Sequence, residues 1–480
     1  MGSNRVKTGL VDLDEILNGG LIRGNIYLLR GGPGIGKTTF GFHYLTHSKS
    51  EKNVFITFTE KSVEIQKNAK KMGFDLSGVR FLDLIPGKEV FVEDETYNLF
   101  YSSEVENGNF TEKIVEFIEK EKPDKIFIDS ITQYQYMMDN DYQYRKQILS
   151  FFEFLKNQKA TVIITSEISN KIDDDDLQFL TDGIIELKSE NEIRKLKIKK
   201  FRGSSFSKGW HHYKITHKGI IVFPILRPKK YSAIFTKEKI TSGVSEIDNL
   251  LHGGFTEGTS TLISGPAGVG KTTFGTLFMK EAASRGERSV IFLFDENKET
   301  FLHRCESVQI PVKSMINKGT LKVYFVEPLE YSTHQFSKLL KIEAENENTN
   351  LIMIDSVKGY ELALRGEDIK RDLTAKIRYL KNMGKTVLLI SEMGKMSGDV
   401  FKITDSGISY IADNVVFLKY VEWDSKLHKT IGVLKQRTSG FENSLREFKI
   451  TKDGVKVGSP LHNMQRILSG TPIKNNKNKI

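Results

Sequence analysis

Two stretches of this 480-residue chain have the residue types and the spacing of a nucleotide-phosphate loop. Residues 31–38 fit the pattern G-x-x-x-x-G-K-[ST], and residues 265–272 repeat it, each after an apolar run. Glycines let consecutive backbone N–H groups converge on one anion, the lysine reaches the β- and γ-phosphates, and the next hydroxyl holds Mg²⁺. Two matches in equivalent contexts argue against chance. The predicted nucleotide contacts are Gly32, Gly34, Ile35, Gly36, Lys37, Thr38 and Thr39 in the first loop, and Gly268, Val269, Gly270, Lys271, Thr272 and Thr273 in the second.

Each loop has a candidate acidic partner for the metal ion. Asp129 follows the apolar run 125–128, and Asp355 follows the run 351–354. A carboxylate at the end of a neighbouring strand can hold the Mg²⁺ shell directly or through water, although an aspartate there can also simply cap the next helix. Because both acids accompany a phosphate loop, we predict the metal role. The predicted metal ligands are Thr38 and Asp129 in the first repeat, and Thr272, Asp355 and Glu296 in the second.

Acids that could orient or activate the attacking group stand just after another apolar run in each repeat. These acids are Glu60 in the first repeat and Asp295 with Glu296 in the second. A carboxylate at such a strand tip can face the γ-phosphate. A surface acid in a strand-to-helix turn is the alternative for any one of them, but their presence in both repeats favours catalysis. Thr59 stands where the second repeat has Asp295, so we expect the two sites to differ in activity.

Two pairs of cations recur at nearly the same distance after their own loops. They are Lys200 with Arg202, and Lys435 with Arg437. Residues i and i+2 of a strand point the same way, so each pair presents two positive charges on one face. A solvated strand face is the alternative. For these repeated pairs we predict that a neighbouring subunit supplies them to stabilise transition-state charge on a phosphate.

An internal repeat organises the whole chain. Thr8-Gly9-Leu10 with Asp14 matches Ser242-Gly243-Val244 with Asp248 at the offset that also relates the two loops. Short apolar runs alternate with longer amphipathic ones, which predicts an α/β fold: two tandem phosphate-loop domains, each a mostly parallel sheet with helices on both faces. The predicted strands are 26–29, 54–58, 125–128, 161–165 and 183–187, then 261–264, 290–294, 351–354, 386–390 and 414–418. Residues 39–48 read as a helix, and residues 196–199 and 431–434 as parts of antiparallel edge hairpins.

Two prolines and a basic pair in residues 224–230 interrupt this pattern and predict the joint between the domains. We expect a first domain at residues 1–228 and a second at residues 236–460. A tail follows at residues 461–480, and its end, rich in lysine and asparagine, is expected to be disordered.

The composition is that of a globular protein from a reducing compartment. Hydrophobic residues make up 39% of the chain and charged residues 28%. No apolar run approaches the ~18 residues of a membrane helix, and residues 1–5 lack the apolar core of a signal peptide. Cys305 is the only cysteine, so no intrachain disulfide forms. We therefore expect a cytoplasmic protein without membrane contact, whose net charge of +10 permits a nucleic-acid partner without requiring one.

Further motifs follow in an order that resembles one family. Glu60 is followed by Ile-Gln-Lys-Asn-Ala at 65–69 and by Gly-Phe-Asp-Leu at 73–76. The most specific stretches are residues 403–413, 445–448 and 467–472. Together with the two loops and the Lys-x-Arg pairs, they resemble the RecA-like ATPases and specifically the KaiC family, over nearly the whole chain.

The resemblance implies two RecA-like domains and a homo-hexamer of double-decked rings, with ATP and Mg²⁺ at subunit interfaces in both decks. The first domain would hydrolyse ATP slowly. The second would transfer phosphate to its own chain, as a signalling or timing switch with a KaiB-like or other signalling partner. The family's phosphorylated Ser-Thr pair matches Ser409-Tyr410, so Ser409 is the candidate acceptor, and Thr404 lies in the same segment. Tyr410 and the short tail depart from the family, which argues against an ordered two-site cycle and against the partner that binds the family's tail.

Two other functions stay open at this point. A RecA-type nucleic-acid-dependent ATPase would use the same core, and the basic run 194–202 suits it. The acidic cluster 173–176, however, lies where a DNA-contacting loop would be expected, so nucleic acid is disfavoured. The third function is a scaffold in which ATP only holds subunits together, which the intact motif sets at both sites argue against.

Overall fold

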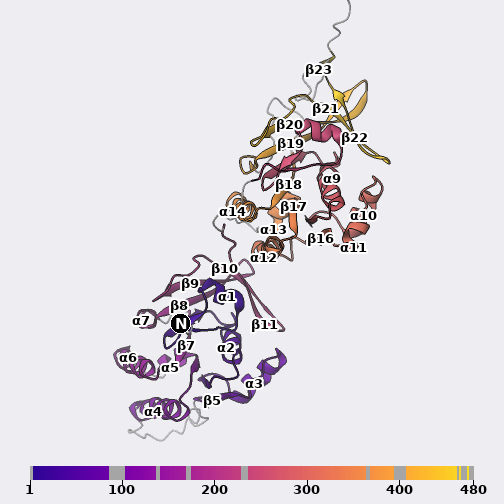
Figure 1. The fold of residues 1–480 in the computed structure, drawn as a ribbon. Helices are drawn as coiled ribbons and strands as arrows, with labels where there is room; N and C mark the ends of the chain where they lie inside the picture. Colours follow the sequence, from indigo (N-terminus) through magenta and orange to yellow (C-terminus); the bar gives the residue numbers. More distant parts are fainter. Residues whose placement is uncertain are drawn as a thin grey trace, which may run out of the picture. The chain divides into compact units, whose positions relative to one another are not determined.

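The computed structural model describes residues 4–85, 103–136, 141–168, 174–228, 236–363, 368–393 and 407–461, with the short strands 464–465 and 473–474. The chain forms two compact units, Met1–Ile225 and Leu226–Ile480. Figure 1 shows them in chain order, from indigo to yellow.

The first unit is built on a nine-stranded sheet in the order β11-β10-β9-β8-β3-β7-β6-β4-β5. The strands from β8 to β5 are parallel, and β9, β10 and β11 continue the sheet in antiparallel fashion. The bounds are β3 Ile26–Gly31, β4 Asn53–Thr57, β5 Val79–Asp83, β6 Lys125–Asp129, β7 Thr161–Glu167, β8 Gly183–Glu190, β9 Ile193–Phe201, β10 His211–Thr216 and β11 Gly219–Phe223. A separate antiparallel pair joins β1 (Arg5–Val6) to β2 (Leu21–Ile22).

Helices cover both faces of this sheet because successive side chains of its central strand are buried on opposite sides. Tyr27 and Leu29 of β3 belong to one apolar core, and Ile26 and Leu28 belong to the other. The first core lies under α1, α2 and α3, and the second under α4, α6 and α7 (Figure 1). The helices are α1 Val11–Ile16, α2 Lys37–Thr46, α3 Ser62–Lys71, α4 Ser103–Glu121, α5 Ile131–Tyr136, α6 Asp141–Asn157 and α7 Asp175–Leu180.

The second unit repeats this architecture. Its sheet has the order β16-β15-β17-β18-β14-β19-β20-β21-β22. Taken from β22 back to β16, this order corresponds strand for strand to that of the first sheet from β11 to β5. The strands are β14 Ser260–Gly265, β15 Arg288–Leu293, β16 Leu321–Phe325, β17 Thr349–Asp355, β18 Thr386–Glu392, β19 Asn414–Trp423, β20 Lys426–Gln436, β21 Arg446–Thr451 and β22 Gly454–Pro460. Two short antiparallel pairs join β12 (Lys239–Ile240) to β13 (Phe255–Thr256) and β23 (Met464–Gln465) to β24 (Ile473–Lys474). The helices are α8 Ser245–Leu250, α9 Lys271–Ser284, α10 Lys298–Glu306, α11 Val312–Asn317, α12 Thr333–Glu345, α13 Val357–Ala363 and α14 Ile369–Asn382.

The predicted fold class is confirmed, and each predicted strand is present with slightly different ends. The helix expected at residues 39–48 begins two residues earlier, at Lys37. The segments around 196–199 and 431–434 form the predicted antiparallel hairpins, but the prediction that they lie at the sheet edge was wrong. Both pair antiparallel to the preceding strand, but two further strands follow them in each sheet. The edge strands β5 and β16 were missed because polar and half-exposed residues interrupt their apolar runs.

The Thr8/Ser242 motif of the internal repeat has a structural role. Thr8 donates to Asp14 through its backbone N–H (3.0 Å) and its hydroxyl (2.9 Å). Ser242 and Asp248 make the same two bonds at 2.7 and 2.9 Å. Each pair fixes the entry to a short helix packed on the core, so the repeat reflects folding here and not chemistry.

Some of the predicted features lie outside the described residues: Thr404 with the rest of 403–406, Asp173, and most of the tail including 467–472. Among the helices that are described, none combines the length and the apolar character needed to cross a bilayer.

Candidate functional site

The two phosphate loops have the same geometry. The Lys37 ammonium donates to the carbonyls of Gly31 (2.8 Å) and Gly32 (2.9 Å). In the second unit, Lys271 donates to Gly265 and Pro266, both at 2.9 Å. Both lysines are buried, and burial lowers the pKa of each below its usual value. Each ammonium is therefore held over its loop, at the start of α2 or α9, where the helix N-terminus also favours an anion.

The predicted metal ligands face one another at the carboxyl ends of the parallel strands in each sheet. The Thr38 hydroxyl donates to Asp129 Oδ2 at 2.6 Å, and Thr165 donates to the other carboxylate oxygen at 2.7 Å. In the second unit the Thr272 hydroxyl bonds to Asp355, and burial raises the pKa of Asp355 to about 6. A hydroxyl and a carboxylate are ligands that Mg²⁺ takes beside phosphate oxygens and water, and a buried carboxylate gains from a cation nearby. These residues fit Mg²⁺.

The predicted acids of the second unit gather in one cleft with a volume of about 160 Å³. Asp295 accepts a hydrogen bond from the Ser356 hydroxyl. Both oxygens of Glu296 accept from Arg304: Oε2 from Nη2 at 2.6 Å, and Oε1 from Nε at 3.1 Å. The cleft is lined by Ala267, Gly268, Lys271, Thr272, Leu293, Asp295, Glu296, Asp355, Ser356, Ile390 and Glu392. Glu296, predicted both as a base and as a metal ligand, is thus occupied by a cation of its own chain.

The first unit differs at this point. Glu60 follows β4, and its turn is closed by the Thr57 hydroxyl, which donates to the Glu60 backbone carbonyl at 2.8 Å. The Glu60 side chain is exposed and has no hydrogen-bond or ion-pair partner within the described part of the chain. Its carboxylate is therefore free to meet a substrate, unlike that of Glu296.

Two acids next to the loops were missed by the sequence analysis. Glu167 ends β7 level with Gly31, and Glu392 ends β18 level with Gly265. Their negative charges raise the pKa of Lys37 and Lys271, against the effect of burial. A Ser-Glu pair ends both strands and could have revealed them, but the expected strands stopped at residues 165 and 390. Arg304 was missed because the first repeat has Asn68 at the corresponding place, so the repeat carries no signal for it.

The Lys-x-Arg pairs lie near the amino ends of the parallel strands, whereas the phosphate loops follow the carboxyl ends of those strands. Lys200 is level with Ile184 near the start of β8, and its ammonium donates to the carbonyls of Gln178 (2.9 Å) and Phe179 (3.0 Å). Arg202 lies 3.7 Å from Asp182. In the second unit Lys435 donates to the Ala412 carbonyl, and Arg437 lies 3.6 Å from Asp413. The structure does not bring either pair to the loop of its own domain.

Ser409 lies in a turn at this same amino end of the parallel strands in the second sheet. The turn comes just before β19, with Ile408 and Ala412 buried in the core and Ser409 half-buried. The Asp413 backbone N–H donates to Ser260, the first residue of β14, at 2.8 Å. Ser409 therefore lies in the turn whose last residues, Ala412 and Asp413, contact Lys435 and Arg437, and it lies away from the loop that follows β14.

The charged segments that bear on nucleic acid are largely paired within the chain. Asp174 lies 2.9 Å from Arg30, and Asp176 lies 2.5 Å from Arg145. In the basic run, Lys195 pairs with Glu190 at 3.2 Å. These ion pairs reduce the charge that either segment presents to a polyanion.

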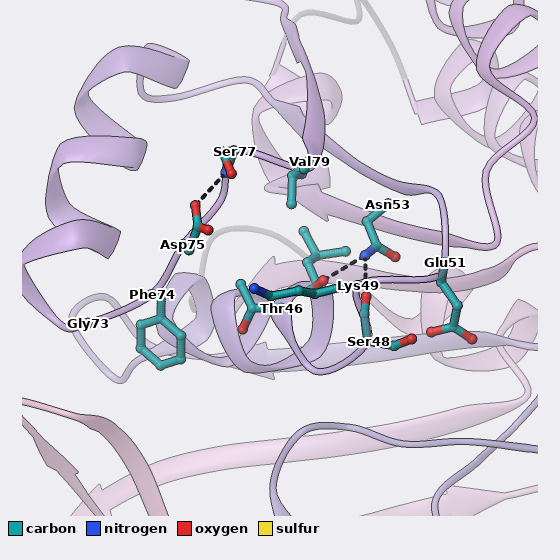
Figure 2. A pocket seen from close by; sticks show the side chains of 12 residues that line it. Thr46, Ser48, Lys49, Glu51, Asn53, Gly73, Phe74, Asp75, Ser77 and Val79 are labelled. Atoms are coloured by element: carbon teal, nitrogen blue, oxygen red, sulfur yellow. Dashed lines mark hydrogen bonds between the residues drawn. The ribbon is translucent and has the colours of Figure 1, made fainter.

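The Gly73-Phe74-Asp75 motif lies away from the phosphate loop. It borders a pocket with a volume of about 450 Å³ beyond the carboxyl end of α2, which Figure 2 shows from close by. There Asn53 donates to the carbonyls of Leu45 (2.7 Å) and Ser48 (3.3 Å), and the Ser77 backbone donates to Asp75 at 3.0 Å. The motif therefore fixes the loop between α3 and β5 and does not line the predicted nucleotide site.

Comparison with known proteins agrees with this geometry. The family model of the KaiC ATPase matches the chain twice, at residues 6–227 and 240–462. The chain is 28% identical to Circadian clock protein KaiC3 of Synechocystis sp., over 98% of its own length and 95% of that protein. It is also 28% identical to Circadian clock oscillator protein KaiC of Synechococcus elongatus, over 98% and 92% of the two chains. Two copies of one ATPase domain, each with its phosphate loop in place, make the chain a member of the KaiC family of ATPases.

Proposed function

We propose that this chain is an ATP-driven switch whose subunits form a homo-hexameric ring, bind ATP and Mg²⁺ between subunits, and transfer phosphate to Ser409. The observation that carries the proposal is the position of the loop and the Lys-x-Arg pair at opposite ends of the parallel strands, in both domains.

Strand length prevents a domain from completing its own site. The six residues of β14 span about 20 Å, which is more than a lysine or arginine side chain can reach. Lys435 and Arg437 can therefore act on a phosphate only at the loop of an adjacent subunit. The same holds for Lys200 and Arg202, which supports ATP sites shared between neighbours.

Hydrolysis in the first domain assigns a task to each predicted residue. Lys37 and the backbone N–H groups of its loop bind the phosphates, with Thr38 and Asp129 placed to hold Mg²⁺, which supplies charge neutralisation when bound. Glu60 takes a proton from the attacking water. Lys200 and Arg202 of the adjacent subunit stabilise the charge that develops on the γ-phosphate.

Phosphoryl transfer in the second domain uses Ser409 as the nucleophile in place of water. Its hydroxyl oxygen attacks the γ-phosphorus bound to the adjacent subunit's loop. The bond from that phosphorus to the bridging oxygen breaks, ADP leaves, and the hydroxyl proton passes to Asp295, while the adjacent Glu296 is held by Arg304. The position of Ser409 supports this, because its turn leads directly into Ala412 and Asp413, which contact Lys435 and Arg437, so the acceptor and the cations lie at the same end of the parallel strands.

The remaining expectations are part of the same proposal. A cytoplasmic setting agrees with the single cysteine, Cys305, which is buried and whose pKa burial raises to about 12. A KaiB-like or other signalling protein is the proposed partner, on the strength of the family. Nucleic acid is disfavoured because the basic run 194–202, which would suit it, is partly neutralised within the chain, as in the pair of Lys195 with Glu190.

Incubation of the full chain with Mg·ATP tests the proposal. Steady ATP turnover is expected, together with phosphate on Ser409 located by mass spectrometry. Ser409→Ala should remove that phosphate, whereas the matched variant Tyr410→Phe should keep it. Absence of phosphate throughout residues 403–413 would exclude self-phosphorylation there. Turnover that survives Lys37→Ala combined with Lys271→Ala would exclude these loops as the ATPase sites.

A further inference from the structure

The catalytic carboxylate of the second domain is held by a cation that the first domain lacks. Arg304 places two N–H groups on the two oxygens of Glu296, at 2.6 and 3.1 Å, in the two-pronged arrangement that matches a guanidinium to a carboxylate. Its third contact is with the Thr273 hydroxyl on the first turn of α9, at 3.1 Å. A single side chain therefore joins α10, the proposed base and the helix that begins at the phosphate loop.

The local fold prepares Arg304 for this position. Asn297 caps α10 directly after Glu296, with its side chain accepting from the Thr300 N–H at 2.9 Å. Phe301, one turn before Arg304, is fully buried, and the Arg304 guanidinium lies 5.5 Å from the centre of its ring. Packing on one side and Thr273 on another restrict the guanidinium, so little conformational entropy is lost when it binds Glu296.

The first domain has the receiving groups but not the arginine. Thr39 corresponds to Thr273, Glu60 to Glu296, and Ile65 to Phe301, while Asn68 stands where the second domain has Arg304. Asn68 is exposed, and the Glu60 side chain has no partner within the described residues. The two domains thus form a natural comparison, in which the proposed bases differ in their neighbours: Asn68 and Thr59 in the first domain, Arg304 and Asp295 in the second.

We propose that Arg304 is a positioning residue that keeps Glu296 out of water activation, so that the second domain hydrolyses ATP more slowly than the first and retains it for phosphoryl transfer. The two oxygens that would accept a proton from water are the two that accept from Arg304. Water attack then requires the ion pair to open first. This inference rests on the proposed function, in which Glu296 serves the second ATP site.

Exchange of the two residues between the domains tests the proposal in the full chain. Arg304→Asn should raise the kcat of ATP turnover by the second domain on the order of tenfold, the rate equivalent of about 1.4 kcal/mol. The KM for ATP should stay unchanged, because Lys271 and the loop backbone are intact. Arg304→Lys keeps the charge without the two-pronged geometry, so its kcat should lie between the parent and Arg304→Asn.

The reciprocal change, Asn68→Arg, should lower turnover by the first domain, because the new guanidinium finds Glu60 and Thr39 in equivalent places. A role of Arg304 in folding alone would not produce this loss. An unchanged or reduced kcat in folded Arg304→Asn would overturn the proposal. If that variant does not fold, unchanged turnover in Asn68→Arg overturns it instead. Absence of ATP turnover in the parent protein would refute the proposed function itself, which is a separate result.

Discussion

A lysine, a threonine and an aspartate form the same small group at both predicted ATP sites. Lys37 is held by loop carbonyls, and Thr38 bonds to Asp129 at 2.6 Å. The second domain repeats the contacts with its own residues. Around this shared group the acids differ, with Thr59 and a free Glu60 in one domain and Asp295 with a paired Glu296 in the other. Differences in activity between the domains are therefore expected to arise from the acids and not from phosphate binding.

Glu60→Gln should abolish most hydrolysis in the first domain while ATP still binds. The amide keeps the shape of the side chain but cannot accept the proton, so we expect turnover there to fall about 10²- to 10⁴-fold. Turnover measured beside ATP binding separates the two effects. Glu64→Gln, an exposed acid in the first turn of α3, is the matched control and should leave both unchanged. Equal loss in the two variants would contradict the role of Glu60.

At the residue scale, the sequence predicted the groups that recur in both repeats. Lys37, Asp129 and Glu60 follow from residue type and spacing, because phosphate loops need a helix N-terminus and an acid on a neighbouring strand. The roles of these residues stay predictions. Arg304 was out of reach because its partner, Glu296, lies eight positions earlier in the chain and on the far side of a cap, and only three-dimensional packing brings them together.

His43 attaches α2 to the last strand of the first sheet. Its Nε2 accepts from the Ile220 N–H at 2.8 Å, and its other ring nitrogen bonds to the Gly9 carbonyl. Burial lowers the pKa of His43 to about 4, against about 6.5 for an unfolded histidine. Only the neutral ring can accept the bond from Ile220.

Acidification should therefore destabilise the first domain. The stabilising effect of His43 is complete above pH ~6.5 and declines as the pH falls toward 4, because the unfolded state binds the proton more tightly, at on the order of 1 kcal/mol per pH unit. Urea unfolding of the first domain at several pH values measures this. His43→Leu should be less stable at pH 7 but show a weaker dependence on pH, whereas a variant of exposed His217 should retain the parent's dependence. An identical pH slope in His43→Leu and the parent would count against this explanation.

Gly36 permits the transition from loop to helix at the first site. It precedes α2 with φ at +103°, and a Cβ there would lie 2.8 Å from Ile215 Cδ1 on β10. Gly36→Ala should destabilise the first domain by about 1–3 kcal/mol and weaken its ATP binding. Gly78→Ala, where a Cβ would meet no atom within 4 Å and φ is not positive, is the control for denaturation and ATP titration. Equal effects of the two substitutions would contradict the steric argument.

At the element scale, buried strands were predictable and edge strands were not. The central strands β3 and β14 are almost wholly buried, so each has an apolar core run, such as residues 26–29 in β3, and leaves little ambiguity. β5 and β16 at the edge need only one or two buried residues, and Lys322 or Arg80 falls inside the run. The antiparallel extensions beyond β9 and β20 depend on pairing between segments, which local periodicity does not encode.

In each of the two units, the carboxyl ends of the parallel strands carry the phosphate loop, and their amino ends lie beside the Lys-x-Arg pair. This arrangement arises because the phosphate loops follow the carboxyl ends of the parallel strands. The strands β9 and β20 run antiparallel to them, so the carboxyl ends of β9 and β20 lie beside the amino ends of the parallel strands. Under the proposed function, each subunit therefore completes the sites of a neighbour and not its own. The central claim is therefore that catalysis is shared between subunits.

A mixture of two inactive variants tests that claim most directly. Lys271→Ala lacks a functional second loop, and Arg437→Ala lacks the cation near the amino ends of the parallel strands. Neither variant by itself should therefore phosphorylate Ser409. When the two variants are mixed under conditions that let subunits exchange, some Arg437→Ala subunits, with an intact loop, will adjoin Lys271→Ala subunits, in which Ser409 and Arg437 are intact. With the chains distinguished by mass, we expect phosphate on Ser409 of the Lys271→Ala chain and not on that of the Arg437→Ala chain. Phosphate confined to the Arg437→Ala chain, or no recovery in subunits shown to mix, would contradict the account.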